Sequence, residues 1–414
     1  MDSAPWNGLV KRDIWCDRDD KEDKLLENKL YEIIGKIMPP DRDAMEKARA
    51  RQESLAKPPG SLGGLEDISV KMAGITGNVK NRIEKSCVVV LCADNGVVEE
   101  GVASAPQSVT MAQTVNFTRR LTGVGALAES FGSELLIVDM GIRDHIPEEL
   151  YDDVPLRDTH KIINRRIRRS TSNLARGAAM TREEAIKGIL TGIEMAEAVK
   201  KTGYDILGVG EMGIGNTTTS AAVLSAVTGR DSSFTCGKGG GLNDEGYIRK
   251  KEIVDKASEG YRACGGLLEQ EKSGRISRDE AADMMVDILA AMGGFDICAM
   301  TGVFLGAAAG RIPAVIDGYI SVVAALAAAV IAPESTAYMF ASHKSFEKGY
   351  MLAVETLGIE PFLSLGMRLG EGSGCPIAFD GIRGACDVMR NMATFEEAEI
   401  NDDYLEEIRN GDCF

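Results

Sequence analysis

Three glycine-rich stretches of the chain carry the side chains that could do chemistry. The first spans residues 208–220 and reads GVGEMGIGNTTTS, after an apolar run and at the start of a helical pattern. Glycines let backbone N–H groups approach an anion closely, and the start of a helix adds partial positive charge. Its threonines can cap the helix and bond phosphate oxygens. The stretch therefore predicts a phosphate cradle, with a tight turn that binds nothing as the alternative.

The same stretch begins with a G-x-G-x-x-G pattern, which is typical of dinucleotide-binding folds. That pattern requires an acidic residue about 20 positions further along the chain, directly after a second strand. Asp231 lies near that distance, but no convincing strand pattern precedes it. An NAD-dependent oxidoreductase therefore stays open as an alternative that the sequence does not favour.

The second stretch, residues 237–244, reads GKGGGLND, with three consecutive glycines before a helix-capping Asn243. It predicts a second anion-binding loop, with a flexible loop tip as the alternative. The chain contains no G-x-x-x-x-G-K-[ST] pattern, so P-loop nucleotide hydrolysis is not supported. It also lacks a G-x-S-x-G pattern, so Ser342 and His343 do not predict a hydrolase triad.

The third stretch, residues 369–374, reads LGEGSG and places one carboxylate, Glu371, between glycines. Glycines cost backbone entropy, so a close approach of the backbone is expected here. If Glu371 is buried beside Leu369 and Met367, desolvation raises its pKa and makes it a competent general base. The alternative is a surface turn in which Glu371 is solvated.

Composition excludes several classes of protein. With a net charge of −16 over 414 residues, the chain does not predict a duplex DNA binder or another nucleic-acid partner. Nine scattered cysteines and three histidines lack metal-ligand spacing, so we expect free thiols, a reducing cytoplasm and no metal site. The longest apolar run, residues 319–332, is shorter than the roughly 20 residues of a membrane span and predicts a buried helix. The polar N-terminus does not resemble a signal peptide.

Four short apolar runs predict the strands that position these residues. They span residues 87–92, 135–138, 206–209 and 314–316, and each ends in an acid beside a glycine. Strands that are apolar on both faces indicate a parallel sheet covered on both sides. With helical patterns between them, they predict a doubly wound α/β fold with a mostly parallel sheet and helices on both faces. Ligands bind beyond the carboxyl ends of such strands, where these acids lie.

Helical patterns precede the first strand. Leu25 to Met38 has helical apolar spacing, and we expect Pro39-Pro40 to end that helix. Asp41 can cap a second helix, and residues 65–76 predict a third.

We therefore predict three parts of the chain. Residues 1–26, which contain Trp6 and Trp15, form a flexible extension. Residues 27–80 and 376–414 form a small helical subdomain, and residues 81–375 form a Rossmann-like α/β catalytic domain.

Taken together, the motifs resemble the nicotinate-nucleotide–dimethylbenzimidazole phosphoribosyltransferase family over residues 27–398. The matching segments, in family order, are 57–63 (KPPGSLG), 103–107 (ASAPQ), 210–218 (GEMGIGNTT), 293–295 (GGF), 311–318 (RIPAVIDG), 341–343 (ASH), 365–374 (LGMRLGEGSG) and 392–395 (MATF). Two departures from the family pattern leave the base specificity open. Asp94-Asn95-Gly96 stands where the family commonly has Asp-His-Gly, and residues 237–241 read GKGGG in place of Gly-Arg-Gly-Thr-Gly.

This resemblance implies transfer of the phosphoribosyl group of nicotinate mononucleotide to an aromatic base, with no cofactor, in a cytoplasmic homodimer. It places catalytic residues at Glu371, the general base, and at Glu211 and Lys250, and the presence of both glutamates disfavours a non-catalytic subunit of the same fold. It places base-binding residues at Gln107, Met212 and Leu369, and nucleotide-binding residues at Gly213, Gly215, Asn216, Thr217, Gly239, Gly318 and Gly370.

Overall fold

The computed structural model of the protein describes residues 21–405. Residues 1–20, which hold most of the predicted extension and both tryptophans, and residues 406–414 lie outside this range. Residues 21–26 belong to the first helix, α1 (Lys21–Ile34). The helix ends at Ile34, before Pro39-Pro40, so the prediction that the prolines end it was wrong.

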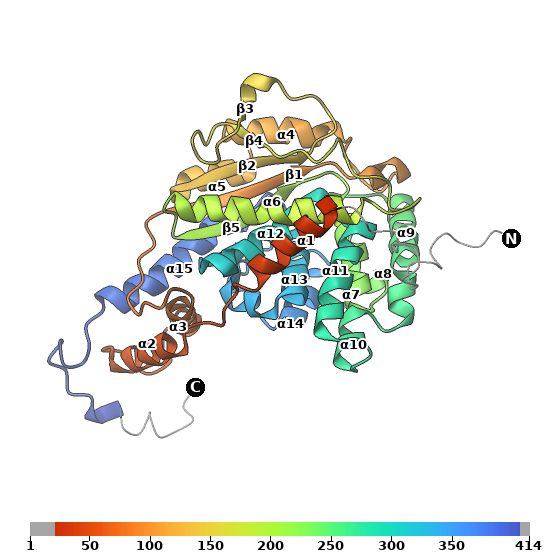
Figure 1. The fold of residues 1–414 in the computed structure, drawn as a ribbon. Helices are drawn as coiled ribbons and strands as arrows, with labels where there is room; N and C mark the ends of the chain where they lie inside the picture. The colour runs from red at the N-terminus through yellow and green to blue at the C-terminus, as the bar shows by residue number, and fades with distance from the viewer. Residues whose placement is uncertain (1–20, 406–414) are drawn as a thin grey trace.

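A parallel β-sheet forms the centre of the molecule (Figure 1). Within the described residues it has seven strands in the order β3-β4-β2-β1-β5-β6-β7, and every pairing is parallel. The predicted doubly wound α/β fold is confirmed, with a sheet that is parallel throughout rather than mostly. The strands are β1 (Ser86–Ala93), β2 (Ser133–Gly141), β3 (Tyr151–Asp152), β4 (Ile162–Asn164), β5 (Ile206–Met212), β6 (Ala314–Ile316) and β7 (Met339–Ala341).

The four predicted strands are β1, β2, β5 and β6. β5 runs further than predicted, because Glu211 and Met212 still pair with β1. β3, β4 and β7 were not predicted, since they have only two or three residues and, unlike the equally short β6, none of them ends in an acid beside a glycine.

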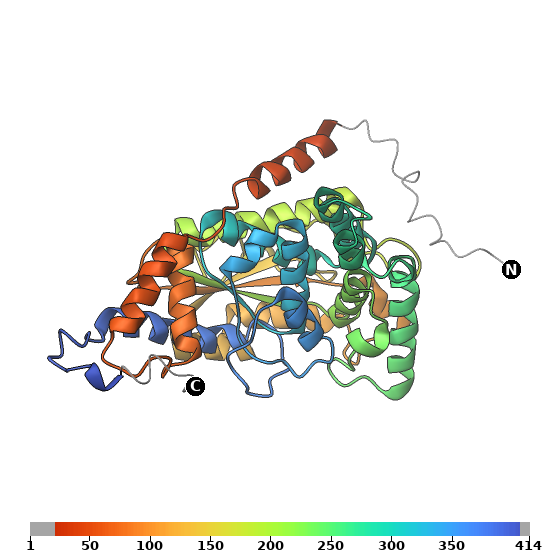
Figure 2. The ribbon, with the colours of Figure 1, turned by 90° about the horizontal axis from the view of Figure 1, so that it is seen from below.

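Helices lie on both faces of the sheet, as the view from below shows (Figure 2). On one face, α12 packs on β1, β2 and β5, and α6 packs on α12. On the other face, α15 packs on β1, β5 and β6 and also contacts α5, which packs on β2. The remaining helices are α2 (Arg42–Ser54), α3 (Gly64–Thr76), α4 (Ser108–Thr118), α5 (Gly123–Phe131), α6 (Arg182–Lys201), α7 (Asn216–Thr228), α8 (Ser232–Thr235), α9 (Asp244–Ala263), α10 (Leu267–Lys272), α11 (Arg278–Met292), α12 (Phe295–Gly310), α13 (Tyr319–Ile331), α14 (Tyr350–Leu357) and α15 (Gly374–Asn391).

Small residues and caps set these helices in place. A Cβ atom on Gly192 of α6 would overlap the carbonyl oxygen of Ala299 in α12, so glycine allows the two helices to touch backbone to backbone. Thr181 forms the predicted capping box at the start of α6, and Asn243 caps α9 as expected. The apolar run after residue 319 is the buried helix α13, as predicted. Among residues 21–405, no helix is both long and apolar enough to cross a membrane.

α2 and α3 lie beside the end of α15, away from the sheet (Figures 1 and 2). Asp41 caps α2, as predicted, by accepting a hydrogen bond from the backbone N–H of Ala44 at 3.0 Å. Leu55, Val70 and Met389 join a small apolar cluster at this junction. α3 also packs into the main core, and the division into a helical subdomain and a catalytic domain stays a prediction.

The strand order fixes where a ligand can bind. The chain passes from β1 to β2 on one side, and later from β5 to β6 on the other. The connections therefore diverge between β1 and β5, and this divergence opens a crevice at their carboxyl ends.

Candidate active site

A cavity of about 310 Å³ lies at this crevice, beyond the carboxyl end of β5. Its walls come from the two glycine-rich loops that follow β5, the segment before α4, the start of α13 and the loop before α15. Its lining consists of Val102, Ala103, Ser104, Ala105, Val109, Gln113, Glu211, Met212, Gly213, Ile214, Gly215, Asn216, Thr217, Lys238, Gly239, Gly240, Gly318, Tyr319, Ile320, His343, Ser345, Glu347, Arg368, Leu369, Gly370 and Glu371.

Glu371 is buried on this wall, with 5% of its surface exposed, so the solvated-turn alternative is wrong. Its backbone lies in the left-handed region at φ 64°, between Gly370 at 86° and Gly372 at 87°. A Cβ atom on Gly210 of β5 would overlap the backbone of Glu371. The glycines on both sides therefore let this loop cross directly over the end of β5, which explains the entropic cost of so many glycines.

The Glu371 carboxylate is fixed at the start of α5. Its Oε2 accepts a hydrogen bond from the backbone N–H of Val124 at 3.1 Å, and the side-chain amide of Gln113 donates to its Oε1 at 3.4 Å. Burial raises the pKa of Glu371, while the N–H groups of Val124 and Gly123 oppose that rise. The result is a desolvated carboxyl group in a defined position, which is the environment that a general base requires.

Glu211 lies beneath the Glu371 loop at the end of β5. Its Oε1 accepts a hydrogen bond from the backbone N–H of Glu371 at 3.4 Å, and its Oε2 accepts one from the side-chain amide of Asn216. Burial and the neighbouring Asp296 raise the pKa of Glu211 to about 8. Glu211 is therefore well placed to support the loop that carries Glu371.

Two further buried acids complete the cluster. Asp317 is one of the acids expected at the end of a strand, but neither Asp317 nor Asp296 was predicted as a site residue. Asp296, at the start of α12, accepts a hydrogen bond from Asn216 at 3.2 Å, and burial raises its pKa to about 7. Asp317, at the end of β6, accepts hydrogen bonds from the backbone N–H groups of Gly372 and Gly374. Burial raises its pKa to about 7 as well. Asp317 lies in the 311–318 segment that carried the family resemblance and Asp296 directly follows the 293–295 segment, but only the fold shows that they meet near Glu211.

The opposite wall is suited to an anion. Gly215 has a φ of 95° and lies directly before α7, so the positive end of the helix faces the cavity near Thr217. Lys250 is buried behind Thr217, and its ammonium group donates to Thr217 Oγ1 at 2.8 Å and to the carbonyl oxygen of Gly237 at 3.1 Å. Burial lowers the pKa of Lys250.

The structure gathers most of the predicted site residues around this one cavity. Lys250 lies directly behind the wall, whereas Gln107 is not part of the lining and contacts Arg143 at 2.8 Å. Gln113, one and a half helical turns further on, faces Glu371 instead. Predicted residues in the lining are Glu211, Met212, Gly213, Gly215, Asn216, Thr217, Gly239, Gly318, Leu369, Gly370 and Glu371. In the described part of the chain, no group of three or more His, Cys, Asp or Glu side chains is arranged to hold a metal ion.

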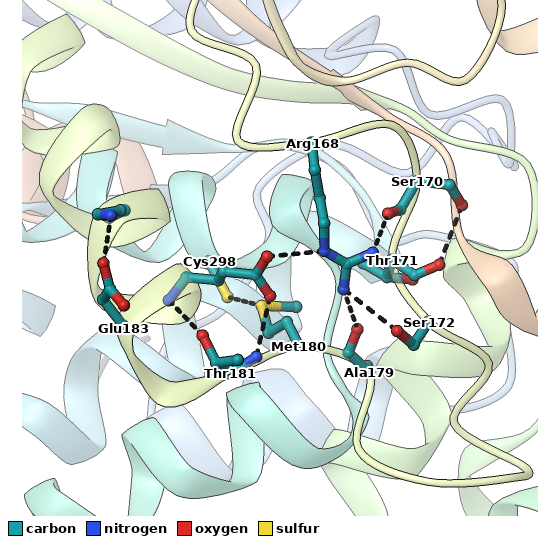
Figure 3. A network of polar contacts seen from close by, with 11 residues as sticks. Arg168, Ser170, Thr171, Ser172, Ala179, Met180, Thr181, Glu183 and Cys298 are labelled. Atoms are coloured by element: carbon teal, nitrogen blue, oxygen red, sulfur yellow. Dashed lines mark hydrogen bonds and ion pairs between the residues drawn. The ribbon is translucent and has the colours of Figure 1, made fainter. Parts of the chain in front are cut away.

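A segment between β4 and α6 supports the loop after β1. Figure 3 shows Arg168 donating hydrogen bonds to the carbonyl oxygens of Ser170 and Ala179 and to the hydroxyl of Ser172. Thr171, within this segment, accepts a hydrogen bond from the backbone N–H of Gly96 at 3.1 Å. Arg168 therefore fixes the segment that supports the Asp94-Asn95-Gly96 loop.

Comparison with known proteins decides the family. A sequence profile described as phosphoribosyltransferase matches residues 37–400. A protein of Clostridium perfringens named nicotinate-nucleotide–dimethylbenzimidazole phosphoribosyltransferase is 50% identical over 385 residues, covering 93% of this chain and 99% of its own. The chain belongs to the nicotinate-nucleotide–dimethylbenzimidazole phosphoribosyltransferase family.

Two more members of this phosphoribosyltransferase family agree with that assignment. The Clostridium tetani protein of the same name is 42% identical, covering 92% of this chain and 98% of its own. The crystal structure of the same-named transferase from Thermus thermophilus is 33% identical, with a TM-score of 0.76, and covers 87% of this chain and 99% of that one. The match extends through both glycine-rich loops and the Glu371 loop, because the family profile spans all three.

Proposed function

We propose that this phosphoribosyltransferase moves the 5-phosphoribosyl group of nicotinate mononucleotide to 5,6-dimethylbenzimidazole or a related base. The products are the α-ribotide of that base and nicotinate, for the nucleotide loop of cobalamin or another cobamide. The observation that carries the proposal is the 50% identity over nearly the whole of both chains to a transferase of that name. The dinucleotide alternative is not favoured, since Asp231 caps the short helix α8 and follows no strand.

The nucleotide phosphate would bind at the start of α7. Thr217 and the backbone near Gly239 line the cavity there, and the positive end of the helix favours an anion. Lys250 adds a charge directly behind Thr217. Gly213, Asn216, Gly318 and Gly370 would complete the nucleotide-binding wall.

The aromatic base would bind between Glu371 and the apolar side chains of Met212 and Leu369. Leu369 covers Gly123 at the start of α5, where a Cβ atom would overlap it. A flat ring at this position has apolar contacts on its faces and a carboxylate at its edge. Gln107 lies outside the cavity lining in this structure, whereas Gln113 lies in the lining and donates to Glu371.

Glu371 would act as the general base. It would accept the proton from one ring nitrogen while the other nitrogen attacks C1′ of the ribose from the face opposite nicotinate. A bond forms between the attacking nitrogen and C1′, and the bond to the pyridine nitrogen breaks. Because that nitrogen is cationic in the substrate, nicotinate leaves with a neutral ring and needs no acid. Attack from the opposite face inverts C1′ and gives the α-ribotide.

Incubation of the full chain with nicotinate mononucleotide and a panel of bases tests this function. We expect nicotinate release with at least one benzimidazole, and a product whose anomeric proton reports the α configuration in the NMR spectrum. Release with purines or phenols alone would move the proposal to a different base. If the protein transfers to none of the bases and binds NAD, the oxidoreductase alternative would replace the proposed transferase function.

Two further properties are proposed by the same resemblance, namely a homodimer and a cytoplasmic location. Light scattering on the purified protein tests the first, with the mass of two chains as the expected result. Fractionation of cells that produce it tests the second, with recovery in the cytoplasmic fraction expected.

A further inference from the structure

Asp317 occupies an unusual position next to the loop that carries Glu371. It follows β6, and 1% of its surface is exposed. Its Oδ2 accepts a hydrogen bond from the backbone N–H of Gly372 at 3.0 Å, and its Oδ1 accepts one from Gly374 at 2.7 Å. Both oxygens of one carboxylate thus hold the two residues on either side of Ser373, directly after Glu371.

The loop needs such an external hold. Gly370, Glu371 and Gly372 all have positive φ values of 86°, 64° and 87°. A left-handed glutamate costs free energy that only the surrounding structure can offset. Gly374 also begins α15, so the Asp317 carboxylate meets the positive end of an 18-residue helix.

No cation competes for this carboxylate. In the part of the chain that the structure describes, no lysine or arginine forms an ion pair with Asp317, and the nearest basic group is His343, whose Nδ1 lies 3.8 Å from Oδ1. Burial lowers the pKa of His343, which favours the neutral ring. The N–H groups of the loop are therefore the main partners that compensate the Asp317 charge.

We propose that Asp317 is a positioning residue for catalysis: by accepting the N–H groups of Gly372 and Gly374, its carboxylate holds Glu371 in its left-handed conformation. This conformation keeps the Glu371 side chain on the start of α5, facing the base. The proposal rests on the proposed function of Glu371 as the general base. The proposed phosphate position, at the start of α7 and near Gly239, is built from other loops, whereas Gly318 and Gly370 adjoin Asp317 and Glu371. Asp317 therefore acts on the chemical step more than on phosphate binding.

The substitution Asp317→Asn tests this role, because an asparagine has one acceptor oxygen and turns an N–H₂ group toward one of the two loop N–H groups. We expect kcat to fall by about 10²-fold, the effect typical of a misplaced catalytic group, with the KM for nicotinate mononucleotide within about threefold of wild type. Asp317→Glu keeps two acceptor oxygens and should retain more activity than Asp317→Asn. It also carries the test if Asp317→Asn does not fold.

Asp139 provides the matched control. It is also fully buried at the end of a strand, and its Oδ1 accepts the N–H groups of Gly141 at 3.0 Å and Ile142 at 2.9 Å. Asp139→Asn should lower stability while leaving kcat per folded molecule unchanged. An equal loss of kcat in both variants, or a normal kcat in Asp317→Asn, would overturn the proposal.

Hydrogen exchange separates this proposal from the proposed function. In Asp317→Asn, peptides that contain Gly372 and Gly374 should exchange faster than in wild type, while Asp139→Asn should leave them protected. This readout needs no substrate. Unchanged protection in Asp317→Asn would overturn the positioning role, whereas a wild-type protein that transfers to no base would overturn the function alone.

Discussion

The two halves of the sheet's carboxyl edge hold their acids in different ways. On the β2–β4 half, Asp139 pairs with Arg166 and accepts a hydrogen bond from the Tyr151 hydroxyl at 2.6 Å. Glu184, at the start of α6, pairs with Arg168 at 2.7 Å. Guanidinium groups compensate these carboxylates and fix the surrounding segments (Figure 3).

On the β5–β6 half, Glu211, Asp317 and Glu371 are held by amide groups instead. Within residues 21–405, none of the three forms an ion pair with lysine or arginine. Burial raises the pKa of each of them, because neutral N–H donors compensate a charge less than a cation does. Arginine-paired acids serve architecture, whereas Glu211 and Asp317, with pKa values raised to about 8 and about 7, remain able to exchange protons near neutral pH.

Among substitutions that test this difference between the two groups of acids, Glu371→Gln should have the largest effect. Removing the proposed base should lower kcat by about 10²–10⁴-fold while binding of nicotinate mononucleotide is largely kept, because the nucleotide wall is untouched. Single-turnover kinetics and nucleotide titration measure the two effects. The same substitution at Glu184, on the arginine-paired half, is the control and should leave kcat unchanged. A Glu371→Gln variant with near wild-type turnover would remove Glu371 from the base role.

Lys250→Met should have the next largest effect. Its buried ammonium donates to Thr217, which faces the cavity, so we expect nucleotide affinity to fall by about 10- to 100-fold, the range of one lost charge-assisted hydrogen bond. Affinity for the base should not change. Lys251→Met is the control, since that lysine lies on the same helix over the ring of Tyr247. Equal losses in both variants would show that overall charge, and not the position of Lys250, controls binding.

Arg168→Met changes the β2–β4 half of the sheet, where arginines pair with the acids. It removes the ion pair to Glu184 and the hydrogen bonds to Ser170 and Ala179, so we expect a loss of about 1–3 kcal/mol in stability. The melting temperature measures this loss, and kcat of the folded protein should stay within about twofold of wild type. A fall in kcat as large as that of Glu371→Gln would mean that the two halves are not separable.

The sequence predicted the fold because its long strands and helices have clear local patterns. β1 and β2 are continuous apolar runs, and the caps Asp41 and Thr181 begin their helices as the residue types require. β4 pairs with the longer β2, whereas β3 pairs with the short β4 and β7 pairs with β6, which is no longer than β7 itself. Their two or three residues carry no pattern of their own.

The site was less predictable, since its contacts join residues far apart in the chain. Glu371 could be suspected from its glycines, but its burial depends on the start of α5, 247 positions away. Asp317 stood inside a recognisable segment and Asp296 directly after one, yet only the packed sheet brings them to Glu211. The choice between Gln107 and Gln113 depends on the direction of α4, which the sequence does not specify.

Asp296→Asn should have the smallest effect. It tests how burying an acid without a cationic partner changes the stability of the folded protein with pH. Burial raises the pKa of Asp296 to about 7 in the folded protein, well above its value of roughly 3.9 in an unfolded chain. Between these values the folded protein retains a proton that the unfolded chain has released. The stability from this group is therefore complete below about pH 4 and is lost as the pH rises through 7.

Asparagine does not titrate, so the variant escapes this loss. The melting temperature of Asp296→Asn relative to wild type should become more positive by about 1–3 °C between pH 5.5 and pH 8.5. Asp205→Asn is the control: Asp205 accepts two backbone N–H groups at the opposite edge of the sheet, at 2.7 and 2.9 Å, and solvent reaches it. Its melting temperature at each pH gives the baseline for an Asp→Asn change outside the acid cluster. A difference that stays constant with pH in Asp296→Asn would show that this acid is ionised throughout, and that amide-held and arginine-paired acids do not differ in the way the sheet edge indicates.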